Sequence, residues 1–365
     1  MNVLEKLRNN RYLIWALVFA LLNMGAVFLI FGFRKYSDTF NDINLIHWFQ
    51  GNGGGVDMAR ILRPLGPLLA LPFEFLGDGA GLILQNIIFY LFSAFLIFKI
   101  TDLIFQNKKQ AFLASIFFVT ATPVIESGLA YLTDMGAWFF YLLSIFLTLI
   151  YFKTRKEGLL ILNGLLSGTG VLMKENGGLG VLFFGLMILL SKEFNIKEKI
   201  LKIMRFGIFF LTPVAITQIL VFKYFHITSL DLYLSGKASL NGEGLLLVFL
   251  RYFGQLFRIL GILWIFFFIG LWEELKIKNW ERIKIYLALI PSSLSFFLWS
   301  IGAGGRAVFI FAPLGILLAT CGCKKIRPLP MVLIILVILV LNYSFVLVNQ
   351  EIPFTDIIYT LLFSR

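Results

Sequence analysis

Long apolar runs recur along the whole chain, and they limit its fold more than any other feature. The chain has 365 residues, of which 59% are hydrophobic and only 14% are charged, and its mean hydropathy is +0.89. A helix of roughly 20 apolar residues can cross the hydrocarbon core of a bilayer. Backbone polar groups in lipid must be satisfied internally. The pattern therefore predicts an all-α, polytopic transmembrane protein.

About eleven helices are expected from the lengths of these runs, and we expect them to form one integral-membrane domain over 1–365 without a separate soluble domain. The first run is too long and too uniformly apolar for a cleaved signal peptide, so it should remain as a helix. The expected helices cover about 12–33, 81–106, 110–124, 135–153, 158–173, 177–191, 205–224, 244–272, 283–301, 306–321 and 329–348.

Basic residues gather between the apolar runs and predict the topology. The formal net charge of +12 would suggest nucleic acid in a soluble protein, but here the cations flank membrane helices and act as topology signals, so no nucleic-acid partner is expected. All the basic clusters fall on one side, taken as cytoplasmic with the N-terminus, only if the proline-containing segment 61–77 does not cross. The clusters lie at 1–11, 107–109, 153–157, 192–205, 273–284 and 322–327.

The first long polar break in the chain is residues 34–63, which contain Asp38, Asp42, Arg60 and Arg63. Ionisable groups in a membrane protein normally face water or a polar cavity, and they often mark functional sites. A carboxylate can take a proton from a hydroxyl nucleophile while cations hold an anionic leaving group. We therefore expect this loop to carry short interfacial helices and part of an active site on the extracytoplasmic face.

Under this topology, four more candidate site residues fall on the same face as that loop. Asp134 opens one expected helix, Lys174 and Glu175 follow the end of another, and Arg306 opens a third. Each has a simpler alternative role. Asp134 could cap its helix, Glu175 could neutralise Lys174, and Arg306 could extend its charge to the lipid headgroups.

The order of several motifs resembles the GT-C superfamily of integral-membrane glycosyltransferases, and most of all the protein mannosyltransferase and aminoarabinose transferase branch. The resemblance covers about 12–320, and it rests on the order and spacing of the motifs rather than on any single one. The motifs are YSD (36–38), RILRPLGPLL (60–69), SGLAYLTDMGAWFFYLLSIFL (127–147), GLLSGTGVLMKENGGLGVLFF (164–184) and GGRAVFIFAPLGILLA (304–319).

The resemblance implies an inverting transfer of a sugar from a polyprenyl-phosphate carrier to a lipid, glycan or protein acceptor. Asp38 matches the first-loop aspartate of the family, which serves as the base. Thr39 stands where the family often has an acidic residue, so Asp42 is the alternative base. A helix cap is the structural alternative for Asp38.

The remaining site residues are expected to bind the donor or another substrate. Arg60, Arg63, Lys174 and Arg306 would hold the carrier phosphate, because guanidinium and ammonium groups bind phosphate oxygens. Headgroup anchoring is the alternative for the two loop arginines. Asp134 and Glu175 are expected to contact substrate.

No metal site is predicted, although the family resemblance leaves open whether a divalent cation takes part, and no other cofactor is expected. His47 and His226 are isolated in the sequence, and Cys321 and Cys323 form a single CxC, which is a weak metal signal.

Two other classes of function remain as alternatives to an enzyme. A transporter or flippase of lipid-linked glycans would be expected to show an internal repeat with broken helices, and no convincing repeat is present. A non-catalytic scaffold would not need the carboxylates. We expect an enzyme in contact with membrane lipids, in a prokaryotic plasma membrane, with its active site extracytoplasmic.

Overall fold

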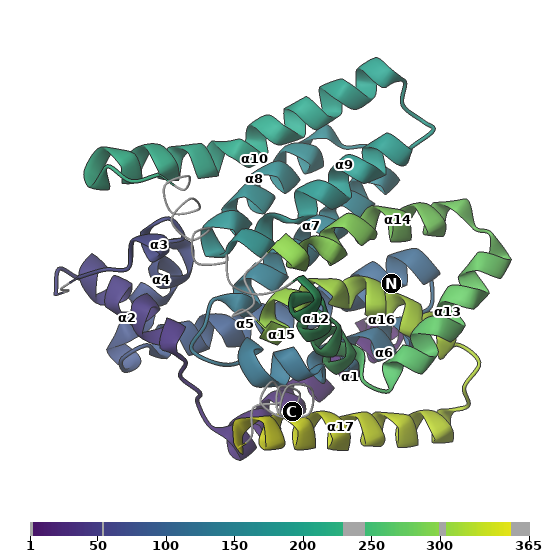
Figure 1. The fold of residues 1–365 in the computed structure, drawn as a ribbon. Coiled ribbons are helices and arrows are strands. Elements are labelled where there is room, and N and C mark those ends of the chain that lie inside the picture. Colours follow the sequence, from purple (N-terminus) through teal and green to yellow (C-terminus); the bar gives the residue numbers. More distant parts are fainter. Residues whose placement is uncertain (1–2, 53–54, 229–244, 299–303, 352–365) are drawn as a thin grey trace.

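The computed structural model describes residues 3–52, 55–228, 245–298 and 304–351, and over these ranges it contains helices and no strands (Figure 1). The predicted all-α class is confirmed. The stretch between the expected helices 205–224 and 244–272 lies largely outside these ranges, as does the segment after 351. The main helices are α1 (Val3–Phe31), α2 (Ser37–Phe49), α3 (Met58–Ile61), α4 (Leu65–Ala70), α5 (Ala80–Phe105), α6 (Lys108–Val119), α7 (Asp134–Thr154), α8 (Glu157–Met173), α9 (Gly180–Leu190), α10 (Ile196–Phe225), α12 (Leu245–Leu260), α13 (Leu263–Ile277), α14 (Trp280–Leu294), α15 (Gly304–Val308), α16 (Ala312–Gly322) and α17 (Pro328–Glu351).

Six helical stretches in the described part of the chain are long and apolar enough to cross a membrane, or seven if a bent pair counts as one span. This confirms a polytopic membrane protein but gives fewer spans than the eleven expected. The other expected segments are helical but short, as α6, α8, α9 and α14 show. The single helix expected over 244–272 is wrong. α12 and α13 meet at 86°, because Gly261 between them has a φ of +48°, a left-handed conformation that ends a helix.

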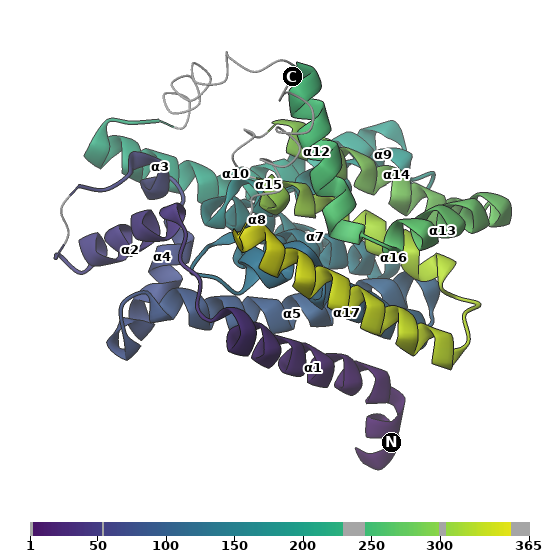
Figure 2. The same cartoon turned by 60° about the horizontal axis from the view of Figure 1, so that its bottom comes forward.

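The core lies along α5, α7 and α16, whose apolar windows are mostly buried, whereas α1, α10 and α17 are mostly exposed. Figure 2 shows α1 and α17 along one edge of the bundle, where Tyr343 of α17 donates a hydrogen bond to the side-chain oxygen of Asn23 in α1 at 3.1 Å. Many leucine and isoleucine side chains on α10 are exposed. Contact between such an apolar surface and water is unfavourable, so this surface is suited to lipid.

Glycines let α8 approach its neighbours closely. Gly164 and Gly168 lie one helical turn apart and face α10, and a Cβ on Gly168 would overlap the carbonyl oxygen of Phe210. Small residues at this spacing are common where membrane helices touch. Gly170 and Gly177 also pack backbone to backbone. The chain therefore folds back tightly after α8, which holds Lys174 at a fixed place between these contacts.

The basic loops meet at one end of the bundle, on the right of Figure 1. There, Lys202 donates to Glu157 at 2.8 Å, and the Arg155 guanidinium pairs with Glu193. The ammonium of Lys192 lies 5.6 Å from the centre of the Trp280 ring. We refer to this region as the basic end.

The opposite end, on the left of Figure 1, carries α2, α3 and α4. The expected non-crossing segment forms α4 and the 3₁₀ turn Leu71–Leu76, with six residues in each. Prolines at 64, 67 and 72 keep these pieces short, because each proline lacks an amide hydrogen. This arrangement leaves the polar loop at the surface of that end.

Candidate active site

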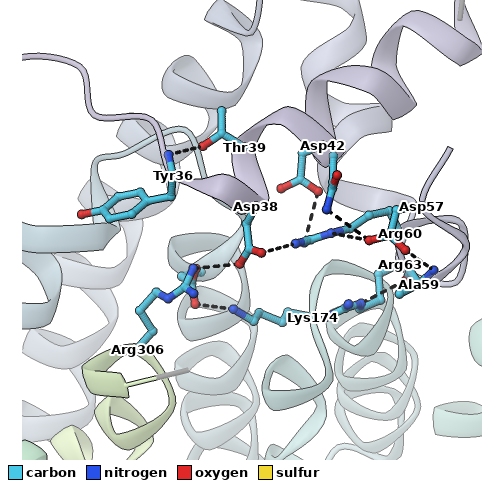
Figure 3. Close-up of polar contacts among 12 residues, drawn as sticks. Tyr36, Asp38, Thr39, Asp42, Asp57, Ala59, Arg60, Arg63, Lys174 and Arg306 are labelled. Atoms are coloured by element: carbon cyan, nitrogen blue, oxygen red, sulfur yellow. Dashed lines mark hydrogen bonds and ion pairs between the residues drawn. The ribbon is translucent and has the colours of Figure 1, made fainter. Parts of the chain in front are cut away.

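Asp38 lies at the centre of a charged site formed by three distant parts of the chain (Figure 3). Its Oδ1 is 3.0 Å from Nη2 of Arg60 in α3, and its Oδ2 is 3.0 Å from Nη1 of Arg306 in α15. These two ion pairs fix the position of the carboxylate. The side chain is still 33% exposed, so a substrate can reach it.

Asp38 does not cap α2, because Thr39 takes that role. The amide of Tyr36 donates to the Thr39 hydroxyl at 2.9 Å, and that hydroxyl donates to the carbonyl oxygen of Tyr131 at 2.9 Å. The departure from the acidic residue of the resembled family thus has a structural explanation. Thr39 is buried at the start of the helix, and the neighbouring carboxylate is free to face the site.

Asp42 follows Asp38 by one helical turn, so the two carboxylates share a face of α2. Its Oδ1 lies 3.3 Å from Nη1 of Arg60, and the residue is only 1% exposed. Arg60 therefore bridges both aspartates. The sequence spacing predicts the shared face, but the burial of Asp42 arises from the packing of α2 against α3 and α4.

A second group of charges joins the site from the core helices. Asp134, at the start of α7, is 1% exposed and accepts a hydrogen bond from Nζ of Lys174 at 2.6 Å. Its other oxygen lies 3.6 Å from Arg306. Arg306 therefore links Asp134 to Asp38 and does not simply extend into the headgroup region.

Arg63 and Glu175 form a separate pair at the edge of this group. Nη1 of Arg63 is 3.0 Å from Oε2 of Glu175, whose side chain is 51% exposed. Glu175 therefore pairs with Arg63, and Lys174 pairs with Asp134. The alternative in which Glu175 neutralises Lys174 is wrong, because the extended backbone at Lys174 turns the two side chains toward different partners.

The structure brings all eight predicted site residues together. Positive and negative groups alternate from Lys174 through Asp134, Arg306, Asp38 and Arg60 to Asp42. Alternation offsets part of the cost of removing each charge from water. An anionic ligand could exchange with a carboxylate for one of these cations, so the arrangement is suited to binding a phosphate.

The two aspartates of α2 differ in their readiness to lose a proton. Burial alone would raise the pKa of Asp38, but the nearby charges of Arg60 and Arg306 outweigh it and hold that pKa below its usual value. Burial raises the pKa of Asp42 to about 6, against the opposing effect of Arg60. Asp38 is the more reliably ionised group, and it is also the more accessible one.

Asp57 also belongs to the cluster, although the motifs do not single it out. It caps α3 by accepting from the amide of Ala59 at 2.9 Å, and it accepts from the side chain of Asn41 at 3.2 Å. Its carboxylate lies 4.0 Å from Nε of Arg60. The spacing of three residues to Arg60 is the signal that could have indicated this pairing.

No group of three or more candidate metal ligands occurs among the residues that the structure describes. His47 pairs with the exposed Asp78 at 3.0 Å, and His226 ends α10. Asp38 and Asp42 both pair with Arg60, which lies between them.

The structure combines a helical membrane bundle with a cluster of carboxylates and cations at one end, an arrangement suited to an anionic ligand. Residues 68–217 match the family model described as dolichyl-phosphate-mannose-protein mannosyltransferase. The match confirms the predicted resemblance: this part of the chain is similar to membrane glycosyltransferases of the GT-C class that use a polyprenyl-phosphate-linked sugar donor. No curated protein matches the chain. The matched residues include Asp134, Lys174 and Glu175, while the loop with Asp38 and the helix with Arg306 lie outside them.

Proposed function

We propose that the chain transfers mannose from a polyprenyl-phosphate carrier to a hydroxyl group of a glycan, lipid or protein acceptor, with inversion at the sugar. The position of Asp38 between Arg60 and Arg306 carries this proposal. The acceptor oxygen forms a bond to the anomeric carbon and gives its proton to Asp38. On the opposite face, the bond from that carbon to the phosphate oxygen breaks, and the polyprenyl phosphate leaves with the electron pair.

Asp38 is a better candidate for the base than Asp42. A base must reach the hydroxyl group of the acceptor, and the side chain of Asp38 is 33% exposed while that of Asp42 is 2% exposed. The lowered pKa of Asp38 keeps it ionised. A pKa near 6 would suit a base acting near neutral pH, but the burial of Asp42 outweighs that advantage.

Arg63, Lys174 and Arg306 are the proposed ligands of the donor phosphate. All three are partly exposed, with side-chain exposures of 20%, 15% and 20%. A phosphate leaving group needs positive charge more than it needs an acid. The exposed Glu175 can contact the sugar or the acceptor once Arg63 turns to the phosphate, and the buried Asp134 orients Lys174.

We also propose that the protein crosses the membrane eleven times, with the N-terminus in the cytoplasm and the site on the extracytoplasmic face of a prokaryotic plasma membrane. The gathering of basic loops at the end opposite the site supports this orientation through the positive-inside rule. The close pairing of α8 with α10 through glycines supports short helices acting as spans.

The test uses the purified protein in liposomes with radiolabelled polyprenyl-phosphate mannose and a membrane extract as acceptor. Asp38→Asn preserves the shape of the side chain and removes the base, so transfer should fall by roughly 10²–10⁴-fold while donor binding remains. Asp78→Asn, at an exposed pair away from the site, should transfer at the wild-type rate.

Mass spectrometry of the labelled product identifies the acceptor class. Movement of the labelled donor across the liposome without any transferred sugar would instead identify a flippase. An Asp38→Asn variant that transfers normally would remove this residue from the mechanism.

A further inference from the structure

Arg60 is surrounded by carboxylates to an extent unlike the other site cations. Nη2 lies 3.0 Å from Asp38, Nη1 lies 3.3 Å from Asp42, and Nε lies 4.0 Å from Asp57. Each of its three nitrogens therefore faces a different acid. Figure 3 shows the guanidinium lying between Asp38 and Asp42.

Burial distinguishes Arg60 from Arg63, which lies in the turn that follows α3. The Arg60 side chain is 9% exposed, and that of Arg63 is 20% exposed. Arg63 makes one ion pair, with a glutamate that is itself half-exposed, so a ligand can displace that partner. A ligand that bound Arg60 would draw it away from Asp42. That carboxylate, which is 1% exposed, would then lie buried beside Asp38 without the cation that pairs with it.

The charges around Arg60 make such an exchange unfavourable. Removing one partner of a buried ion pair leaves an uncompensated charge, which costs more than the pair itself contributes. The guanidinium of Arg60 is the positive charge that Asp38, Asp42 and Asp57 share.

We propose that Arg60 is a positioning residue that acts as a fixed internal counter-cation for Asp38 and Asp42, and that it does not bind the donor phosphate. This role rests on the proposed function, because it concerns how the base is held. It replaces the phosphate-binding role expected from the sequence. Arg60 keeps the Asp38 carboxylate ionised and aimed, and it shields that carboxylate from the repulsion of Asp42.

The first experiment separates donor binding from turnover. Affinity for a polyprenyl phosphate is measured for the wild type, Arg60→Gln and Arg63→Gln. Arg60→Gln should stay within about threefold of the wild type, whereas Arg63→Gln should weaken binding by about tenfold or more. Transfer by Arg60→Gln should nevertheless fall at least as far as transfer by Arg63→Gln. Equal loss of donor affinity in both variants would overturn the proposal.

The second experiment follows the pH dependence of transfer. Asp38 also faces Arg306 and Lys174, and Asp42 also faces Arg63 and Lys174, so these charges remain in an Arg60 variant. Loss of Arg60 raises the pKa of both aspartates. In the plot of transfer rate against pH, the fall in rate on the acidic side should therefore occur at higher pH in Arg60→Gln than in the wild type. Arg60→Lys keeps the positive charge, so its acidic fall in rate should return most of the way to the pH of the wild type. An acidic fall in rate that does not move in Arg60→Gln would contradict the proposal.

An infrared measurement tests the same role without using activity. At pH 7.5, Arg60→Gln should show the carbonyl stretch of a protonated carboxyl group that the wild type lacks, and Arg60→Gln with Asp42→Asn should lose it. Absence of that band would overturn the proposal. If the wild type neither binds polyprenyl phosphate nor transfers sugar, the proposed function fails, while the infrared result still decides the role of Arg60.

Discussion

Asp38 and Asp42 lie one turn apart on α2, but their surroundings separate the pH ranges in which each is charged. The pKa of Asp38 lies below its usual value because of Arg60 and Arg306, and burial raises the pKa of Asp42 to about 6. A base works in its ionised form, so its activity is lost as the pH falls through its pKa. We expect wild-type transfer to persist well below pH 6, and Asp42→Asn to leave its acidic limb in place.

The measurement for this prediction is the rate of sugar transfer by the wild type and Asp42→Asn between about pH 4 and 8. This window contains the titration of Asp42 and lies above that of Asp38. Donor concentration is kept saturating, so that the pH dependence reports the chemical step. An acidic limb centred near pH 6 in the wild type, and absent from Asp42→Asn, would assign the base to Asp42 instead.

Arg63 provides a second prediction at the level of single residues. The planar guanidinium of Arg63 can donate hydrogen bonds to two phosphate oxygens at once, which the ammonium group of a lysine cannot do in the same geometry. Arg63→Ala should weaken binding of polyprenyl phosphate by roughly 1.5–3 kcal/mol, and Arg63→Lys should weaken it less because the charge survives. Equilibrium binding of a fluorescent polyprenyl phosphate measures both. Arg155→Ala, at the basic end, is the control for a general loss of positive charge, and wild-type affinity in Arg63→Ala would remove Arg63 from the site.

At the scale of elements, the spacing between α8 and α10 depends on the absence of a side chain at Gly168. A Cβ there would overlap the carbonyl oxygen of Phe210, whereas a Cβ on Gly158 of the same helix would meet no atom within 4 Å. Gly168→Ala should therefore lower stability by roughly 1–3 kcal/mol through overpacking. Gly158→Ala should be neutral or slightly stabilising, because alanine favours the helix.

Thermal unfolding in detergent compares the two glycine variants, and donor binding then reports on Lys174. This residue follows α8 directly, so displacement of the helix should weaken the hydrogen bond from Lys174 to Asp134 and reduce donor affinity. Equal melting temperatures for Gly168→Ala and Gly158→Ala would show that α8 and α10 can separate without cost.

At the scale of the whole molecule, the two ends of the bundle predict which residues can be labelled from each side of the membrane. Ser37 and Asn52 are exposed at the site end, and Lys156 and Lys324 are exposed at the basic end. Cysteines introduced at the first two positions should react in whole cells with a reagent that cannot cross membranes. Cysteines at the other two should react only after the cells are opened.

The native Cys321 and Cys323 are buried and are replaced by serine in the background used for labelling. Ser127, which is also expected on the extracytoplasmic face, is 3% exposed and is therefore unsuitable as a reporter. Protection of Ser37→Cys in whole cells together with reaction of Lys156→Cys would reverse the orientation.

The sequence by itself determined the class of fold and most of the residues in the site. Apolar runs in lipid have few alternatives to helices, since the backbone must satisfy its own hydrogen bonds. The structure contains helices at most of the expected places, and the break within 244–272 is an exception. Ionisable residues are costly at such places, so Asp38, Asp134, Lys174 and Arg306 could be selected as site residues from local context alone. The family match confirms the resemblance over residues 68–217, which include Asp134 and Lys174 but not Asp38 or Arg306.

Only the tertiary structure decided which of these groups pair, because partners are chosen by distance in space. Arg306 reaches Asp38 across 268 positions of the chain, and Glu175 turns to Arg63 rather than to its sequence neighbour Lys174. The burial that separates Asp42 from Asp38 depends on how α2 packs against α3 and α4. The break between α12 and α13 depends on one glycine conformation that hydropathy does not register. Charge pairing and burial depend on how the helices pack against each other. The local sequence shows only which residues are present to form such pairs.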